Sequence, residues 1–166
     1  TVQRQWMYLE NIFMGEDIRK QMPRETVMFD RVDGAWKVIT ARMKEIKYAR
    51  VACTEEGLLK QLNSMNDDLE LIQKALDQYL EAKRQLFPRF YFVSNDDLLE
   101  ILGQSRNPKA VMPHMLKCFD NIKTLELEQP AQKSKPMDAK GMYSADGEFV
   151  PFSKPCSLSG AVESWL

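Results

Sequence analysis

The chain has 166 residues, of which 44% are hydrophobic and 28% are charged, and these values are typical of a globular protein that fits one domain. Lys and Arg total 23 and Asp and Glu total 24, and residues 1–86 carry 14 of each kind. The even distribution argues against nucleic-acid binding and against attachment to a membrane surface. The apolar runs are also too short for a transmembrane helix.

The first residues predict a helix followed by a loop. Trp6, Leu9 and Phe13 recur at spacings of three and four, so residues 3–13 are predicted to be the end of a helix. Gly15 then predicts a loop. The chain starts without Met and ends within an apolar pattern, so we expect a fragment of a longer polypeptide.

Two long helices with heptad patterns follow. The first is predicted to begin at Pro23, because a proline at the first helical position loses no hydrogen bond. Its apolar stripe contains Phe29, Val32, Trp36, Ile39, Met43 and Ile46. The stripe of the second helix contains Leu58, Leu62, Met65, Leu69, Ile72, Leu76 and Tyr79. Lys83 interrupts this second stripe, and Leu86 resumes it. The two helices predict an antiparallel hairpin, and Leu59 and Leu80 make the second stripe wider than the seam of a free coiled coil.

An aromatic segment, LFPRFYFV, interrupts the helical pattern. Pro88 is predicted to end the second long helix, since it has no N–H and clashes with the preceding turn. The residues after it favour extended structure, so residues 88–93 are predicted to be a short strand. We expect Phe90 and Phe92 to be buried there and to plug a junction between helical bundles.

A short helix and a kinked helix are predicted next. Ser94 and Asp97 form a variant of the capping box, and Gly103 is the predicted end of the helix that they start. Asn107-Pro108 begins another helix, in which Pro113 predicts a kink or a restart.

The period of the sequence then changes from helical to alternating. Residues 123–157 predict strands and a β-hairpin with its turn at Asp146-Gly147, and residues 160–166 predict the start of another helix. Residues 1–122 are predicted to be mostly helical. The predicted fold class is therefore mainly α, an elongated helical bundle of hairpins with a small antiparallel β element near the C-terminal end.

No motif for catalysis, phosphate binding or metal binding is evident, so no catalytic, cofactor-binding or metal-binding residues are predicted. The single histidine, His114, has no partner evident in the sequence and is interpreted as a residue of the helix surface or the core edge. The acidic pairs Asp67-Asp68 and Asp96-Asp97 are interpreted as a solvated helix face and a helix start. Cys53, Cys118 and Cys156 show no metal-ligand spacing, which favours free thiols in a reducing compartment.

Three stretches resemble one known family. They are WMYLENIFMGEDIRKQMPRE, LDQYLEAKRQLFPRFYFVSNDDLLEILGQSRNP and AVMPHMLKCFDNI, and the FPRFYF segment followed by LLEI is the most specific of them. Together with SADGEFVPF and GAVESWL they make the chain similar to the linker region of dynein heavy chains over residues 1–166. NPKAVMPH is more similar to axonemal than to cytoplasmic dyneins.

The resemblance implies a mechanical role. In this family the linker is a curved stack of helical bundles that lies across a ring of ATPase modules and bends as the nucleotide state of the ring changes. The implied partners are the ring and the tail of the parent chain, other dynein subunits, and microtubules through the parent only, with no nucleic acid and no membrane. ATP and Mg²⁺ would bind the parent motor downstream, and the implied location is the cytoplasmic cytoskeleton, in the axoneme of a cilium or flagellum.

We hypothesise that a few residues set the angles between the bundles of this lever. The candidate junction residues are Gly15, Phe87, Pro88, Phe90, Tyr91, Phe92 and Gly103. An alternative is a helical or coiled-coil scaffold for protein–protein interaction without a motor role, for which Leu58, Met65 and Ile72 would be exposed. An enzyme whose active site contains His114 and the carboxylate pairs is the weakest of the three hypotheses.

Overall fold

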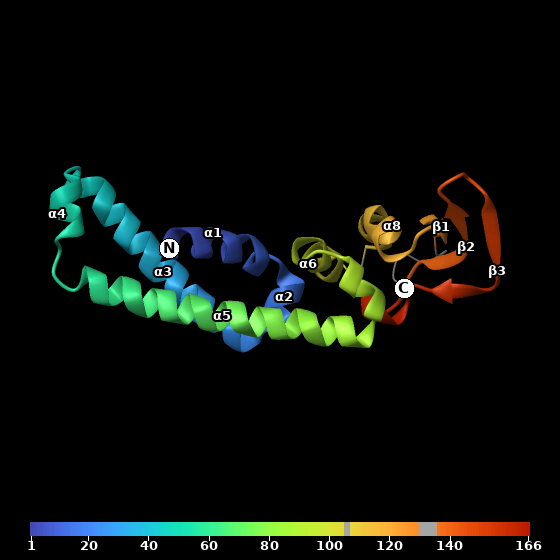
Figure 1. Cartoon of the computed structure of the whole chain (residues 1–166), viewed down its shortest axis with the longest axis horizontal. Coiled ribbons are helices and arrows are strands. Elements are labelled where there is room, and N and C mark those ends of the chain that lie inside the picture. Colours follow the sequence, from blue (N-terminus) through green and yellow to red (C-terminus); the bar gives the residue numbers. More distant parts are fainter. Residues whose placement is uncertain (105–106, 130–135) are drawn as a thin grey trace. The chain divides into compact units, whose positions relative to one another are not determined.

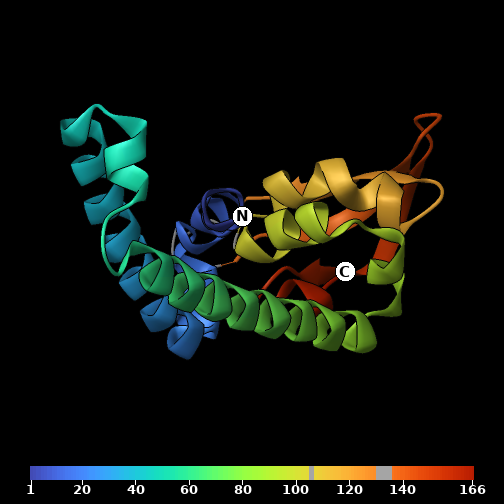
Figure 2. The same cartoon turned by 60° about the vertical axis from the view of Figure 1, so that its left-hand side comes forward.

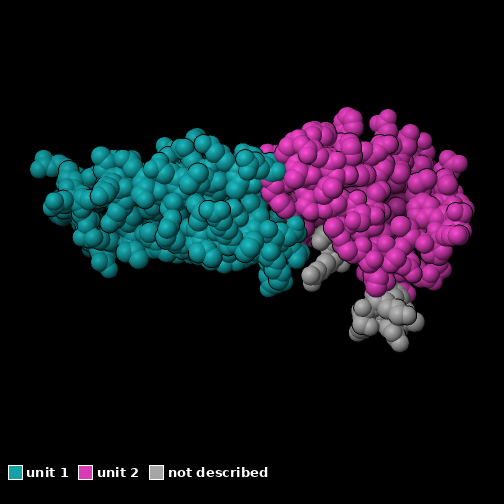
Figure 3. Space-filling model, turned by 90° about the horizontal axis from the view of Figure 1, so that it is seen from below, with its two compact units in different colours: residues 1–78 teal, residues 79–166 magenta. Residues whose placement is uncertain are grey.

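The computed structural model describes residues 1–104, 107–129 and 136–166. The length of the chain fits one domain, but the structure divides into two compact units, Thr1–Gln78 and Tyr79–Leu166 (Figure 3). No helix in the described ranges is long and apolar enough to cross a membrane. The connector between the first two predicted strands lies partly outside the described residues.

The first unit is helical. Its elements are α1 (Val2–Phe13), α2 (Glu16–Gln21), α3 (Pro23–Ile46), α4 (Ala49–Cys53) and the first part of α5 (Leu58–Leu86). Pro23 is the first residue of α3, as predicted. Helix α5 runs back from α4 in the direction opposite to α3 (Figure 1), and an ion pair of 2.8 Å between Arg31 and Asp68 joins the two helices. This arrangement agrees with the predicted antiparallel hairpin.

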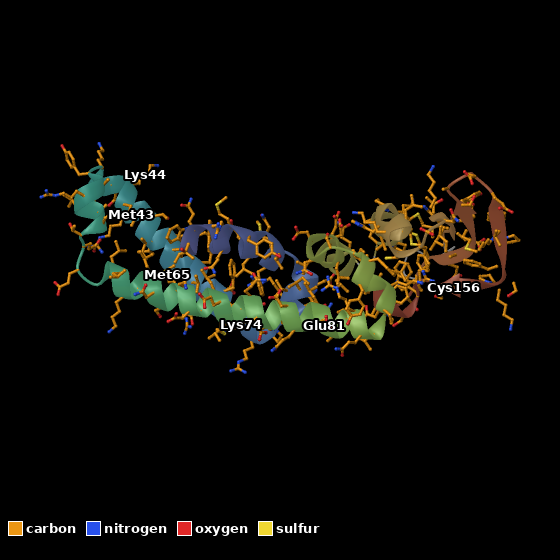
Figure 4. The ribbon with its side chains drawn as sticks, viewed as in Figure 1. Met43, Lys44, Met65, Lys74, Glu81 and Cys156 are labelled. Atoms are coloured by element: carbon orange, nitrogen blue, oxygen red, sulfur yellow. The ribbon has the colours of Figure 1, made fainter. Side chains whose placement is uncertain are left out.

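The heptad residues form the core of the first unit. On α3 the buried members are Phe29, Val32 and Ile39, and on α5 they are Leu58, Met65, Leu69, Ile72 and Leu76. The ring of Phe29 stacks on Phe13 of α1 with centroids 5.2 Å apart. Met65 on α5 is buried in this core, whereas Met43 on α3 is only partly buried (Figure 4). Leu59 is 73% exposed, so its predicted place in the stripe is wrong.

The second unit combines the end of α5 with short helices and a sheet. Its further elements are the 3₁₀ turn η1 (Pro88–Phe92), α6 (Asn95–Gly103), α7 (Pro108–Val111), η2 (Met112–His114), α8 (Met115–Cys118), β1 (Ile122–Glu128), β2 (Asp138–Ser144), β3 (Phe149–Ser157) and η3 (Val162–Ser164). Pro113 lies in η2, a 3₁₀ turn that separates α7 from α8. Residues 160–166, predicted to start a helix, form the single turn η3.

The predicted strand at residues 88–93 is wrong, because this segment is a 3₁₀ turn. The N–H of Phe90 donates to the carbonyl of Phe87, and the N–H of Val93 donates to the carbonyl of Phe90, which is the i to i+3 pattern. A strand would point Phe90 and Phe92 to the same face. In the turn Phe90 is fully buried, whereas Phe92 is 76% exposed. Burial of one ring therefore outweighs the strand preference of the segment.

The sheet confirms the predicted β element. Its order is β1-β2-β3 with both pairs antiparallel. The turn between β2 and β3 contains Gly147 with φ 90°, a left-handed conformation that glycine adopts without strain. Helix α8 and η2 contact β1, so the helical part of the unit covers the sheet at this strand (Figure 2).

Replacing Gly141 and Gly34 by alanine should have opposite effects. A Cβ at Gly141 in β2 would lie 2.7 Å from the carbonyl oxygen of Val150 and 2.5 Å from the ring of Phe149. Gly141→Ala should therefore lower the free energy of unfolding by about 1–3 kcal/mol, the usual cost of overpacking. Apart from the neighbouring residues and the backbone of α3 itself, no atom of the described residues lies within 4 Å of a Cβ at Gly34. Gly34→Ala should raise the free energy of unfolding by as much as about 1 kcal/mol. Urea denaturation of both variants checks this, and equal shifts in midpoint would contradict it.

Candidate functional site

The predicted junction residues are only partly brought together. Phe87, Pro88 and Phe90 lie where α5 ends, in the second unit. Tyr91 and Phe92 follow them in η1 but are exposed. Gly103 is the last residue of α6, and Gly15 is the N-cap of α2 in the first unit. The structure therefore defines one compact site, the α5–α6 junction, by which we mean residues 83–94.

Aromatic rings fix η1 against the α8 end. The ring of Phe90 meets the ring of Phe87 edge to face, with centroids 4.8 Å apart. Phe87 also lies 6.2 Å from Phe119, the residue after α8. The guanidinium of Arg89 lies 4.8 Å from the centre of the Phe119 ring and donates a 3.2 Å hydrogen bond to the carbonyl of Cys118. Stacking and a hydrogen bond thus hold η1 to the C-terminal end of α8.

Arg84 holds the end of α5 to the start of α6. Its side chain donates to the carbonyl oxygens of Phe90 and Val93, both at 3.3 Å, and to Oδ1 of Asn95 at 2.7 Å. Phe90 lies in η1, Val93 is the residue that follows η1, and Asn95 is the first residue of α6. One planar guanidinium therefore spans the whole turn, which the donor geometry of arginine allows. The sequence reasoning missed Arg84, because nothing in a helical pattern distinguishes it from a solvated arginine.

Lys83 makes an ion pair with Glu163 of η3. The side chains are 16% and 9% exposed, and the Nζ of Lys83 lies 5.5 Å from the centre of the Tyr79 ring. The sequence showed that Lys83 interrupts the apolar stripe of α5, and this pair explains the interruption. The partner is 80 residues away along the chain, so no local pattern could identify it.

The outer side of the junction carries a polar contact. The hydroxyl of Tyr91 donates a 2.6 Å hydrogen bond to Oε1 of Glu81. Figure 4 labels Glu81 on α5. This bond, together with the negative charge of Glu81, raises the pKa of Tyr91. Ser94 caps α6 as predicted, because its hydroxyl accepts from the N–H of Asp97 at 3.3 Å and donates to the carboxylate of Asp97 at 2.7 Å.

His114 lies at a second group of charged residues in the same unit. It is 6% exposed, and its ring nitrogens lie 3.6 Å from Oδ1 of Asp97 and 3.5 Å from Oε2 of Glu100. The Nζ of Lys117 lies 2.8 Å from Asp97. Hydrogen bonds from Lys117 and Ser94 lower the pKa of the Asp97 carboxyl. Asp97 was assigned only to the helix start, so the sequence reasoning missed its second role beside His114.

A groove lies between the C-terminal end of α8 and the sheet. It has a volume of about 550 Å³, and the residues that line it include Met115, Phe119, Met142, Phe152, Cys156 and Trp165. Cys118 is buried, and this burial raises the pKa of its thiol. Cys53, Cys118 and Cys156 are free, as predicted.

Heptad-packed helices that form a hairpin define a helical-bundle protein, here with a small antiparallel sheet in its second unit. The comparisons with known proteins give the family. The family model described as "Dynein heavy chain, N-terminal region 2" matches residues 1–166. The chain therefore belongs to the dynein heavy chain family.

The relatives are axonemal, as predicted from NPKAVMPH. Over the full length of this chain, 60% of residues are identical to "Dynein axonemal heavy chain 2" of Mus musculus. Over 99% of the chain, 51% are identical to "Dynein-1-beta heavy chain, flagellar inner arm I1 complex" of Chlamydomonas reinhardtii. "Dynein axonemal heavy chain 1" of Rattus norvegicus is 43% identical over 99% of the chain. The chain spans about 4% of the length of each relative.

Proposed function

We propose that this chain is a segment of the mechanical linker of an axonemal dynein heavy chain. It transmits conformational change in the ATPase ring to the tail during microtubule-based movement. Membership of the family and the axonemal names of the relatives support the proposal. The ATPase modules, with their ATP and Mg²⁺, then lie elsewhere in the parent chain, and this segment needs no cofactor of its own.

The observation that carries the proposal is the way in which the α5–α6 junction is held. A lever passes on a displacement only if its joints resist bending, and a chain turn between two helices bends readily unless side chains span it. Here Arg84 spans the turn with three hydrogen bonds, and Phe90 fills its inner side. These contacts support a stiff joint at this place.

The partners and location follow from the same proposal. The segment contacts the ring and the tail of its own heavy chain, acts with other dynein subunits, and reaches microtubules only through the parent motor in the axoneme of a cilium or flagellum. The scaffold alternative needed an exposed heptad seam, but Leu58, Met65 and Ile72 are buried within the first unit. We therefore retain the linker as the proposed function.

Arg84→Met tests the joint, because it keeps the apolar stem but removes the donors. In the 166-residue chain it should lower the free energy of unfolding by about 1.5–3 kcal/mol, the contribution of hydrogen bonds from a charged group. In the parent heavy chain it should slow microtubule gliding while ATP turnover per motor is retained. Arg84→Lys should be intermediate, since one ammonium cannot reach all three acceptors.

Arg50→Met is the matched control, because the Arg50 side chain is exposed on α4. It should leave unfolding, gliding and ATP turnover unchanged. If Arg84→Met lowered gliding and ATP turnover in equal proportion, the joint would not be a transmission element, and the proposal would fail.

A further inference from the structure

Three side chains of the kinds that bind metal ions converge where α6 meets η2. Asp97 and Glu100 are three residues apart on α6, so their carboxylates lie on the same side of the helix. His114 belongs to η2 and brings its imidazole to them. One ring nitrogen and one oxygen of each carboxylate lie within 4.8 Å of one another. Two elements therefore supply three ligand atoms to one small volume.

A ring nitrogen of His114 is buried without a partner. The residue is 6% exposed, and within the described part of the chain its Nδ1 makes no hydrogen bond. Folded proteins rarely leave a buried polar atom unpaired. Nδ1 lies 3.6 Å from Oδ1 of Asp97, which is too long for a hydrogen bond. Two ligands of one tetrahedral zinc ion lie about 3.3–3.4 Å apart, so an ion between these two atoms would give Nδ1 its missing partner.

The carboxylate of Asp97 is already oriented for this role. The hydroxyl of Ser94 donates a 2.7 Å hydrogen bond to Oδ2 of Asp97. Oδ1 is therefore the oxygen that faces His114. A hydrogen bond to the second oxygen of a carboxylate is common in metal sites, because it fixes the direction of the oxygen that binds the ion.

Two side-chain movements would complete a site for one cation. The carboxylate of Glu100 lies 3.5 Å from Nε2 of His114, so it has to rotate toward Nδ1, and its side chain is 55% exposed. The ammonium of Lys117 lies 2.8 Å from Oδ1 of Asp97, where it takes the place of a cation. The Lys117 side chain is 45% exposed and can move into solvent. Lys117 is thus the competitor of a bound ion.

We propose that Asp97, Glu100 and His114 bind a divalent transition-metal ion, of which Zn²⁺ fits best. The imidazole nitrogen favours Zn²⁺ over Mg²⁺ and Ca²⁺, which prefer ligand sets made of oxygen alone. The two carboxylates neutralise the charge of the ion, and water fills the fourth position. The ion ties α6, the helix that follows the α5–α6 junction, to η2. Its role is to stabilise a unit that also folds without it, so it is structural and not a cofactor of the motor reaction.

Calorimetric titration and nuclear magnetic resonance with ZnCl₂ test the site. Both use the 166-residue chain with Cys53→Ser, because the exposed thiol of Cys53 is itself a zinc ligand. His114 is the single histidine of the sequence, so its ring signals report on this site alone. One Zn²⁺ should bind and shift these signals. At a Zn²⁺ concentration about 100 times the dissociation constant, the melting temperature should rise by about 5–10 °C.

Two variants should change the affinity for Zn²⁺ in opposite directions. Glu100→Gln should weaken binding by more than about tenfold, because it removes a charged ligand. Glu100 is exposed and is not part of the α6 cap, so this variant should fold normally. Lys117→Met should tighten binding, because it removes the ammonium that competes for Asp97. Asp146→Asn removes an exposed carboxylate from the turn between β2 and β3 and should leave the affinity unchanged.

The opposite signs of these effects separate a built site from binding at scattered surface carboxylates. Absence of Zn²⁺ binding, or binding that leaves the ring signals of His114 unchanged, would overturn the proposal. Equal affinities of the Glu100→Gln, Lys117→Met and Asp146→Asn variants would also overturn it, because they would show an adventitious ion only.

Discussion

Phe90→Ala is expected to lower the free energy of unfolding by about 3–5 kcal/mol, the usual cost of removing a buried phenylalanine ring. Phe90 is fully buried, and its ring is in edge-to-face contact with Phe87. Its removal would leave a cavity on the inner side of η1, where Phe87 also contacts Phe119. Burial of this ring favours the 3₁₀ turn over the strand that residues 88–93 would otherwise prefer. The substitution should therefore also make the turn less ordered.

Phe92→Ala is the matched control for this experiment. The two residues are in the same turn and have the same side chain, but Phe92 is 76% exposed. Its replacement should change the unfolding free energy by about 0.5 kcal/mol or less, as for most surface positions. Urea denaturation of both variants gives the comparison. Equal losses would mean that Phe92 is covered in solution and that the described turn is wrong.

Glu163→Ala is expected to have the second large effect, a loss of about 3 kcal/mol. The substitution leaves the Lys83 ammonium without its carboxylate in a site where only 16% of the lysine side chain is exposed. Breaking a buried ion pair from one side typically costs about 3–5 kcal/mol, because the remaining charge stays desolvated. We place the value at the low end, since the ring of Tyr79 still lies 5.5 Å from the ammonium.

The double variant Lys83→Met/Glu163→Leu separates loss of the pair from loss of packing. Replacing both charges with apolar side chains removes the desolvation cost together with the attraction, so stability should return to near the wild-type value or above it. Calorimetric melting of the single and double variants measures the recovery. If Glu163→Ala lowered the free energy of unfolding by less than about 1 kcal/mol, the ion pair would be screened by water.

Local patterns predicted much of this fold. The period of 3.5 residues placed the stripes of α3 and α5, and Leu69, Ile72 and Leu76 are fully buried as expected. Pro23 at the start of α3 and Ser94 at the start of α6 were also predicted, because helix starts depend on side chains within three residues. The turn at Asp146-Gly147 was predicted for the same reason, because the residues of a turn determine its conformation locally.

Other features depend on contacts between residues distant in sequence. The intrinsic preference of residues 88–93 predicted a strand, but ring contacts decide their conformation. Phe87 contacts Phe90 and also Phe119, which is distant in the sequence. Glu163 is 80 residues from Lys83, and His114 is 17 residues from Asp97. Charged residues of this kind look like solvated surface until the fold brings their partners near.

We propose that Arg84 makes the α5–α6 junction a joint that transmits force, and the stall force of the motor in an optical trap measures this transmission. The parent heavy chain that carries Arg84→Met should stall at a lower load than the one that carries Arg50→Met, while the two hydrolyse ATP at equal rates. Equal stall forces would contradict the claim, because a joint that lost its three hydrogen bonds would then transmit force as well as the intact one.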